Sequence, residues 1–328
     1  MTSNHSIASP LALHTLYGET MGTRWRVDLY APRNERLDPL HGAVQARLDA
    51  IVAQMSSWEP ESDLSRFNRA PAGSWHALPD DFFAVLDCAL QVAHDSDGAF
   101  DPAIGAIVGA WGFGAHAHAR GVPDAGTLAD ASAASGWRQL QLDRDARRLR
   151  QPGGLALDLS AIAKGYGVDA VVELLRERGV DAALVDVGGE LRGHGRKPDG
   201  TPWRVLVERG ELDDAAPCVI TLDDAAIATS GPYWQRFEAD SRELSHTIDP
   251  RIGAPVADAP AAVSVIAGSA MLADAWSTAL TVMGVEAGAA FAEARGLAVR
   301  LLPADADADA HAHAQALTTP AFDACLAS

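Results

Sequence analysis

The chain has 328 residues, of which 48% are hydrophobic and 21% are charged, and its formal net charge is −18. This length exceeds what one small core serves, so we expect one large domain or two closely packed ones. The acidic surface argues against nucleic acid or an anionic membrane as a partner, and an anionic substrate would have to meet a metal or a helix N-terminus.

Hydrophobic periodicity predicts a series of strands and helices. The first strand is expected at Thr23–Tyr30, and helices are expected at Leu40–Met55, Asp80–His94 and 269–283, the last capped by Ser269. Further strands are expected at residues 155–159, 182–187, 203–208, 218–222, 262–267 and 298–302. Residues 1–16 and 304–328 are predicted to be flexible tails, the second of low complexity and acidic.

The tail and the cysteines bear on the cellular compartment. The first 16 residues show no basic segment before an apolar run and no lipobox cysteine, and no apolar run approaches the roughly 18 residues that span a bilayer. The cysteines are odd in number and far apart, which does not fit a disulfide framework. We therefore expect a cytoplasmic protein without a transmembrane segment.

Two side chains in the first half of the chain are candidates for ligand contact. Trp58 lies in the polar loop of residues 56–68, where it is either a packing anchor or a platform that stacks on a ring. Asp101 precedes Pro102 in a glycine-rich turn, and such a step leaves a carboxylate and nearby backbone groups facing outward.

The stretch Leu155–Val172 combines a predicted strand, a turn of small residues and a helix N-terminus, an arrangement that can hold an anion on backbone N–H groups. Asp158 lies in the strand and Lys164 at the start of the helix. These two residues indicate either a metal–phosphate site or an ordinary turn with a structural Asp–Lys pair.

A second candidate pair lies in the predicted helix at 269–283. Asp274 and Thr278 are four residues apart, so both side chains lie on one face of the helix. Oxygen atoms of this kind suit a hard divalent cation, and the alternative is a hydrogen bond between the two side chains on a surface stripe.

Six blocks of sequence, in their order and spacing, resemble the ApbE family, the FAD:protein FMN transferases, over residues 16–303. They are MGTRW (21–25), SSWEPESDLSRFN (56–68), FDPAIGAIVGAWGFG (100–114), LDLSAIAKGYGVD (157–169), SGPYWQRFEADSRELSHTIDPRIGAPV (230–256) and ADAWSTAL (273–280). VDVGGELRGHG (185–195) supports the match.

The resemblance implies an α+β fold of the T-fold-like kind over residues 17–303, with mixed sheets and flanking helices around an FAD cleft. It also implies an enzyme that cleaves the pyrophosphate of FAD and releases AMP. FMN is then attached by a phosphoester bond to a Thr or Ser hydroxyl of a target flavoprotein.

Site residues follow from the resemblance position by position. It implies a divalent metal, Mg²⁺ or else Mn²⁺, held by the Asp274 carboxylate, the Thr278 hydroxyl and the backbone carbonyl of Ala161. It implies that His246 is the base that acts on the acceptor hydroxyl. The implied FAD contacts are Met21, Trp58, Ala99, Phe100, Asp101, Asp158, Lys164 and Ile248.

Two positions beside the histidine segment depart from the family pattern. Pro232 stands where an acidic or amide residue is usual, and Ile252 stands where threonine is usual. Both are expected to affect acceptor recognition rather than FAD binding. The alternatives to a transferase are therefore an Mg²⁺-dependent FAD pyrophosphatase, in which water replaces the protein acceptor, and a non-catalytic flavin carrier.

Overall fold

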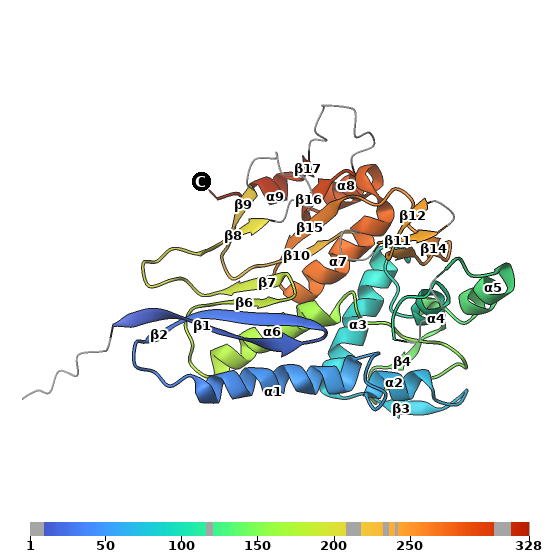
Figure 1. Cartoon of the computed structure of the whole chain (residues 1–328), viewed down its shortest axis with the longest axis horizontal. Coiled ribbons are helices and arrows are strands. Elements are labelled where there is room, and N and C mark those ends of the chain that lie inside the picture. The colour runs from blue at the N-terminus through green and yellow to red at the C-terminus, as the bar shows by residue number, and fades with distance from the viewer. Residues whose placement is uncertain are drawn as a thin grey trace, which may run out of the picture.

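The computed structural model describes residues 10–115, 121–207, 218–231, 236–239, 242–304 and 316–327, with the backbone alone at 236–239 and 242–244. One large antiparallel sheet, covered by helices on one face, organises this part of the chain (Figure 1). Among the described residues, no helix has both the length and the apolar character needed to cross a membrane.

Eight strands form the main sheet, and every neighbouring pair is antiparallel. In spatial order they are β1 (Leu11–Thr20), β2 (Thr23–Pro32), β6 (Ala183–Val187), β7 (Glu190–His194), β10 (Ala226–Ser230), β15 (Ala262–Ala267), β16 (Ala298–Leu302) and β17 (Leu317–Thr318). The strand predicted at Thr23–Tyr30 is confirmed as β2. β1 begins inside the predicted tail of residues 1–16, because its backbone pairs with β2 along its whole length.

Four helices cover one face of the sheet: α1 (Asp38–Met55), α6 (Ala163–Glu177), α7 (Ala270–Met283) and α8 (Val285–Ala294). Strand alternation turns Val27 and Val185 toward α1 and α6, and Val263 and Val299 toward α7 and α8. The helices predicted at Leu40–Met55 and 269–283 are confirmed. The Ser269 hydroxyl caps α7 by accepting a hydrogen bond from the Leu272 N–H at 3.2 Å.

The other face of the sheet packs against a hairpin and a short helix, β8 (Trp203–Val207), β9 (Cys218–Leu222) and α9 (Pro320–Asp323). Phe322 is completely buried there, beside Ile227 and Ile266. The prediction of a tail over residues 304–328 is wrong for its last part, because this aromatic side chain joins the core. Residues 305–315 lie outside the described residues.

The remaining elements lie beside the helical layer. The helices are α2 (Asp63–Asn68), α3 (Asp80–Asp95), α4 (Gly105–Ala110), α5 (Ala125–Ala133) and a 3₁₀ turn at Trp137–Gln139. The strands are β3 (Trp75–Ala77), β4 (Gln141–Asp143), β5 (Arg148–Arg150), β11 (Arg236–Ala239), β12 (Arg242–Ser245), β13 (Ile248–Asp249) and β14 (Ala254–Pro255). Apolar side chains of α2, α3, α7 and α8 form one continuous core, so this region is packed directly against the sheet layer.

The stretch at 155–159, predicted as a strand, pairs with no strand of the described chain. The Asn68 side chain instead bonds both the N–H and the carbonyl of Leu157, at 2.8 and 3.0 Å, and the Asp158 N–H donates to the Pro102 carbonyl at 2.9 Å. The prediction is wrong because a side chain and a turn satisfy backbone groups that a neighbouring strand would otherwise pair. These contacts bring residues 68, 102 and 158 side by side.

A polar cluster fixes the first turn of α6 against two other helices. The Tyr166 hydroxyl donates to Asp81 of α3 at 2.5 Å, and Arg47 of α1 donates two hydrogen bonds to the same carboxylate at 2.5 and 2.7 Å. The hydrogen bond from Arg47 lowers the pKa of Asp81 to about 2, so the carboxylate stays ionised and the cluster stays intact at neutral pH.

Candidate active site

Asp274, one of the predicted site residues, lies where α6 and α7 pack against each other. The Gly165 N–H, in the first turn of α6, donates to the Asp274 carboxylate of α7 at 3.0 Å. Only 4% of Asp274 is exposed. The N-terminus of α6 therefore holds an anion, as the sequence pattern indicated, but that anion is a carboxylate of the chain itself.

The hydrogen bond to Asp274 changes what the neighbouring carbonyl can do. In a regular helix the Gly165 N–H would donate to the carbonyl of Ala161, four residues earlier. In the described chain that carbonyl accepts no hydrogen bond from another backbone N–H or from a side chain. Its lone pairs are therefore available to a ligand at the start of α6.

The Thr278 hydroxyl is similarly available, one turn after Asp274 on the same helix. Within the described chain this hydroxyl makes no hydrogen bond. The Asp274 carbonyl, to which it could have donated, accepts a hydrogen bond from the Ser277 hydroxyl instead. The alternative of a side-chain hydrogen bond between Asp274 and Thr278 is therefore not found. One carboxylate, one hydroxyl and one carbonyl form a donor set of oxygens alone, which fits a hard cation such as Mg²⁺. Over the same residues, no group of three or more His, Cys, Asp or Glu side chains could hold a metal.

A buried lysine stands beside this donor set. The Lys164 ammonium forms an ion pair with Glu190, the first residue of β7, of which only 3% is exposed. The Asp–Lys pair considered from the sequence is therefore replaced by a Glu–Lys pair between residues 26 positions apart. The Asp158 carboxylate instead accepts a hydrogen bond from the Ser160 N–H at 2.8 Å, within its own turn.

The charges of Lys164, Glu190 and Asp274 act on one another, and all three pKa values are raised. Burial raises the pKa of Asp274, and burial together with the charge of Asp274 raises the pKa of Glu190 to about 8. Burial alone would lower the pKa of Lys164, but the charges of Asp274 and Glu190 outweigh it. Each group favours its protonated form, so the cluster as a whole attracts positive charge.

Glu190 was not singled out from the sequence. Its Oε2 atom is buried and has no hydrogen-bond partner among the described residues. This unpartnered oxygen and the raised pKa values of Glu190 and Asp274 agree with a site that takes an additional cation near Asp274. The signal in the sequence was an acidic residue directly after Gly188-Gly189, at an inward position of a strand.

Asp101 lies in a turn rather than facing outward. Its carboxylate accepts hydrogen bonds from the Ala103 N–H at 2.7 Å and the Trp137 N–H at 3.0 Å. Burial raises the pKa of Asp101 to about 6. The side chain therefore holds the segment of residues 99–105 in shape, next to the stretch at 155–159.

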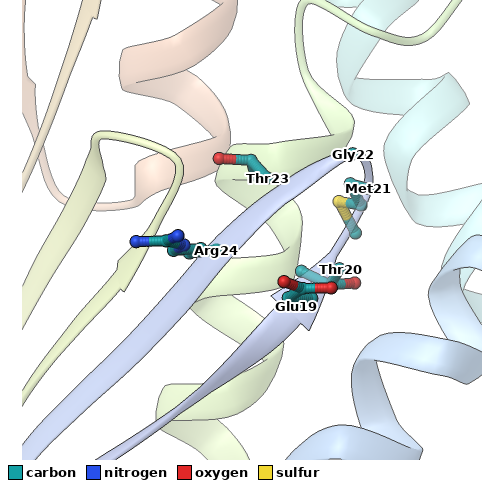
Figure 2. Close-up of a pocket in the computed structure, with 6 residues that line it drawn as sticks. All are labelled: Glu19, Thr20, Met21, Gly22, Thr23 and Arg24. Carbon is teal, nitrogen blue, oxygen red and sulfur yellow. The ribbon is translucent and has the colours of Figure 1, made fainter.

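Met21 lies at the turn between β1 and β2, with φ = 50°, and lines an open cavity of about 630 Å³. Figure 2 shows the six residues that line this cavity, from Glu19 to Arg24. The end of the Met21 side chain also faces the first turns of α6, because a Cβ added at Gly167 would lie 3.2 Å from Met21 Cε. The cavity is therefore next to the helix that carries Lys164.

The other implied FAD contacts differ in how accessible they are. Trp58 is 70% exposed, as a stacking platform would be, and it is not a packing anchor. Ala99 and Phe100 are buried in the core, and Ile248 is buried in a small cluster with Ile107 and Trp111. None of these three side chains is accessible at the surface.

The histidine segment packs on α4. His246 is half-buried and follows β12, and the next residues pack on α4, where the Trp111 indole N–H donates to the Gly253 carbonyl at 2.8 Å. Ile252 is 68% exposed on this loop, and Pro232 lies outside the described residues. Arg251, in the same segment, donates a hydrogen bond to the Val282 carbonyl of α7 at 3.4 Å.

Comparisons with known proteins agree with this arrangement. The model of the ApbE family matches residues 21–301. A protein of Klebsiella pneumoniae named FAD:protein FMN transferase is 34% identical over 300 residues, which cover 90% of this chain and 86% of the relative.

Solved structures extend the likeness to the fold. The flavinyl transferase ApbE of Pseudomonas stutzeri, in its apo form, superposes with a TM-score of 0.87 at 37% identity, covering 97% of this chain and 98% of the other. The flavin transferase ApbE of Vibrio cholerae superposes with a TM-score of 0.86 at 32% identity, covering 97% and 100%. The predicted α+β fold with flanking helices is thereby confirmed.

Proposed function

The chain belongs to the ApbE family, and on that premise we propose that it is an Mg²⁺-dependent FAD:protein FMN transferase whose acceptor is a Thr or Ser hydroxyl of a flavoprotein. FAD and a protein acceptor are the two substrates that this activity requires. The metal dependence is supported by the buried Asp274 carboxylate at the contact between α6 and α7, together with the Thr278 hydroxyl and the Ala161 carbonyl, which accept no hydrogen bond within the described chain.

Bound Mg²⁺ would neutralise charge on the diphosphate and act as a Lewis acid on its oxygens. The Lys164 ammonium adds positive charge at the same end of α6, while Glu190 fixes its position. Met21, Trp58 and the segments at 99–101 and 158 are proposed to hold FAD around this point. Asp101 and Asp158 do so through the turns that they stabilise.

The transfer breaks a phosphoanhydride bond of FAD and forms a phosphoester bond on the acceptor. The acceptor oxygen forms a bond to the phosphorus of the FMN half, and the bond from that phosphorus to the bridging oxygen of the diphosphate breaks. AMP carries away the bridging oxygen, and His246 takes the proton of the acceptor hydroxyl. A histidine suits this role because the ordinary pKa of an imidazole, ~6.5, is close to physiological pH.

The proposed function is tested by incubating the protein with FAD, Mg²⁺ and an acceptor domain that bears a threonine. A fluorescent acceptor band in a denaturing gel is expected, and the band should be missing when that threonine is replaced by valine. FMN and AMP in solution without a labelled acceptor would show a pyrophosphatase instead. Bound FAD with no turnover would show a carrier.

His246→Ala is expected to slow FMN transfer by about 10²–10⁴-fold, the usual contribution of a positioned general base. The dissociation constant of FAD should change little, because the proposed role concerns the acceptor hydroxyl. Transfer rates from in-gel fluorescence and FAD titration of each variant would measure the two effects separately.

The matched control for this substitution is His94→Ala, which removes an exposed histidine at the end of α3. This variant should leave the rate of FMN transfer and the dissociation constant of FAD unchanged. A His246→Ala variant that loses FAD binding but keeps its turnover would contradict the role as a base.

A further inference from the structure

α6 and α7 cap each other: a carboxylate of each helix accepts hydrogen bonds from backbone N–H groups in the first turn of the other. Asp169 of α6 accepts hydrogen bonds from the N–H groups of Ala270 and Met271 in α7, both at 2.9 Å. In return, Asp274 of α7 accepts one from the Gly165 N–H of α6 at 3.0 Å. On each helix the carboxylate lies four residues after the first N–H group that the other helix caps, so the contact is reciprocal.

Asp169 is itself held in place from the sheet. Arg192 of β7 donates to its Oδ1 atom at 2.7 Å, and each of the two side chains is only 12% exposed. The Asp169 carboxylate accepts this bond and the two from α7, so displacing it would leave a buried charge uncompensated, although the Arg192 Nε atom has no hydrogen-bond partner among the described residues. The Asp169 carboxylate is therefore a fixed point to which the N-terminus of α7 is attached.

These reciprocal hydrogen bonds matter for the metal because the proposed ligands lie on α7 and in the residues just before α6. The Ala161 carbonyl precedes α6, whereas Asp274 and Thr278 belong to α7, so their relative position depends on the register between the helices. This step depends on the proposed function. We propose that Asp169, which touches neither metal nor substrate, is a positioning residue that sets this register and thereby brings the two halves of the metal site together.

The test is Asp169→Asn, which preserves the size of the side chain and one acceptor oxygen but loses the charge and the second acceptor. The dissociation constant of Mg²⁺, measured by calorimetry on the protein without FAD, is expected to rise about 10–100-fold, as for other residues that orient metal ligands. The Mg²⁺ concentration for half-maximal FMN transfer should rise in parallel. The rate at saturating Mg²⁺ should stay near that of the wild type.

Ser269→Ala provides the matched control, because it also removes a cap of α7 but one that lies within that helix. It should lower the melting temperature while changing Mg²⁺ affinity less than twofold. If Asp169→Asn and Ser269→Ala weaken Mg²⁺ binding equally at equal loss of stability, Asp169 acts only on stability and the proposal is overturned. If Asp169→Asn does not fold, Asp169→Glu, which keeps the charge and moves both oxygens by one methylene, carries the same expectation.

The two proposals fail in different ways. If Asp169→Asn binds Mg²⁺ as tightly as the wild type does, the positioning role is overturned and the proposed function stands. A wild-type protein that transfers FMN without binding Mg²⁺ overturns the metal site, and the positioning role with it.

Discussion

Asp274→Asn is expected to reduce FMN transfer by about a thousandfold or more, since a metal contributes several kcal/mol to the stabilisation of the transition state. Asparagine keeps the shape of the side chain and can still accept the hydrogen bond from the Gly165 N–H. It lacks the negative charge that a divalent cation requires. The fold should survive, because burial already raises the pKa of Asp274 and a neutral amide avoids the cost of burying that charge.

Thermal melting with and without Mg²⁺ separates the loss of metal from a loss of structure. The wild type should melt at a higher temperature when Mg²⁺ is added, because a ligand that binds only the native state stabilises it. Asp274→Asn should melt at the same temperature in both conditions. Asp145→Asn, at an exposed position between β4 and β5, is the control and should behave as the wild type does. A Mg²⁺-dependent shift of normal size in Asp274→Asn would rule out this carboxylate as a ligand.

Local patterns in the sequence were sufficient for the long elements. Apolar spacing predicted α1, α3 and α7, and Ser269 was correctly predicted as the cap of α7. The same reasoning failed at 155–159, where alternation correctly indicated buried leucines but not their backbone partners. Periodicity reports which side chains are buried, whereas the Asn68 side chain that bonds Leu157 lies 89 residues earlier.

The candidate site was harder to predict because its contacts are non-local. Lys164 was placed with Asp158, six residues away, although its partner is Glu190 and the nearby negative charge of Asp274 comes from another helix. Of the residues that the family resemblance implied for the metal, Asp274 and Thr278 lie on α7 and Ala161 lies just before α6. The contacts of Asp169 and Gly165 with α7 were not predicted, although an acidic residue on the buried face of a helix, four residues after a glycine, indicates a position that another backbone can approach.

Gly165→Ala is expected to lower the free energy of unfolding by about 2–4 kcal/mol, from overpacking together with the loss of helix caps. A Cβ at this position would lie 2.3 Å from the Ala270 carbonyl oxygen and 2.8 Å from the Met271 backbone nitrogen. Both are backbone atoms of α7 and cannot rotate away, so the helices must separate. Separation would break the hydrogen bonds of Asp169 and Asp274, so Mg²⁺ binding should weaken as well. Urea unfolding and Mg²⁺ calorimetry measure the two losses.

Gly42→Ala provides the matched control, because the same substitution in α1 meets no atom within 4 Å. There alanine should stabilise the protein by about 0.5–1 kcal/mol through its higher helix propensity. The higher helix propensity of alanine acts at both positions. Changes of opposite sign in the free energy of unfolding would therefore isolate the steric effect at the α6–α7 contact. Stabilisation by both substitutions would show that the two helices can move apart at no cost, and that the metal ligands do not depend on the close approach at Gly165.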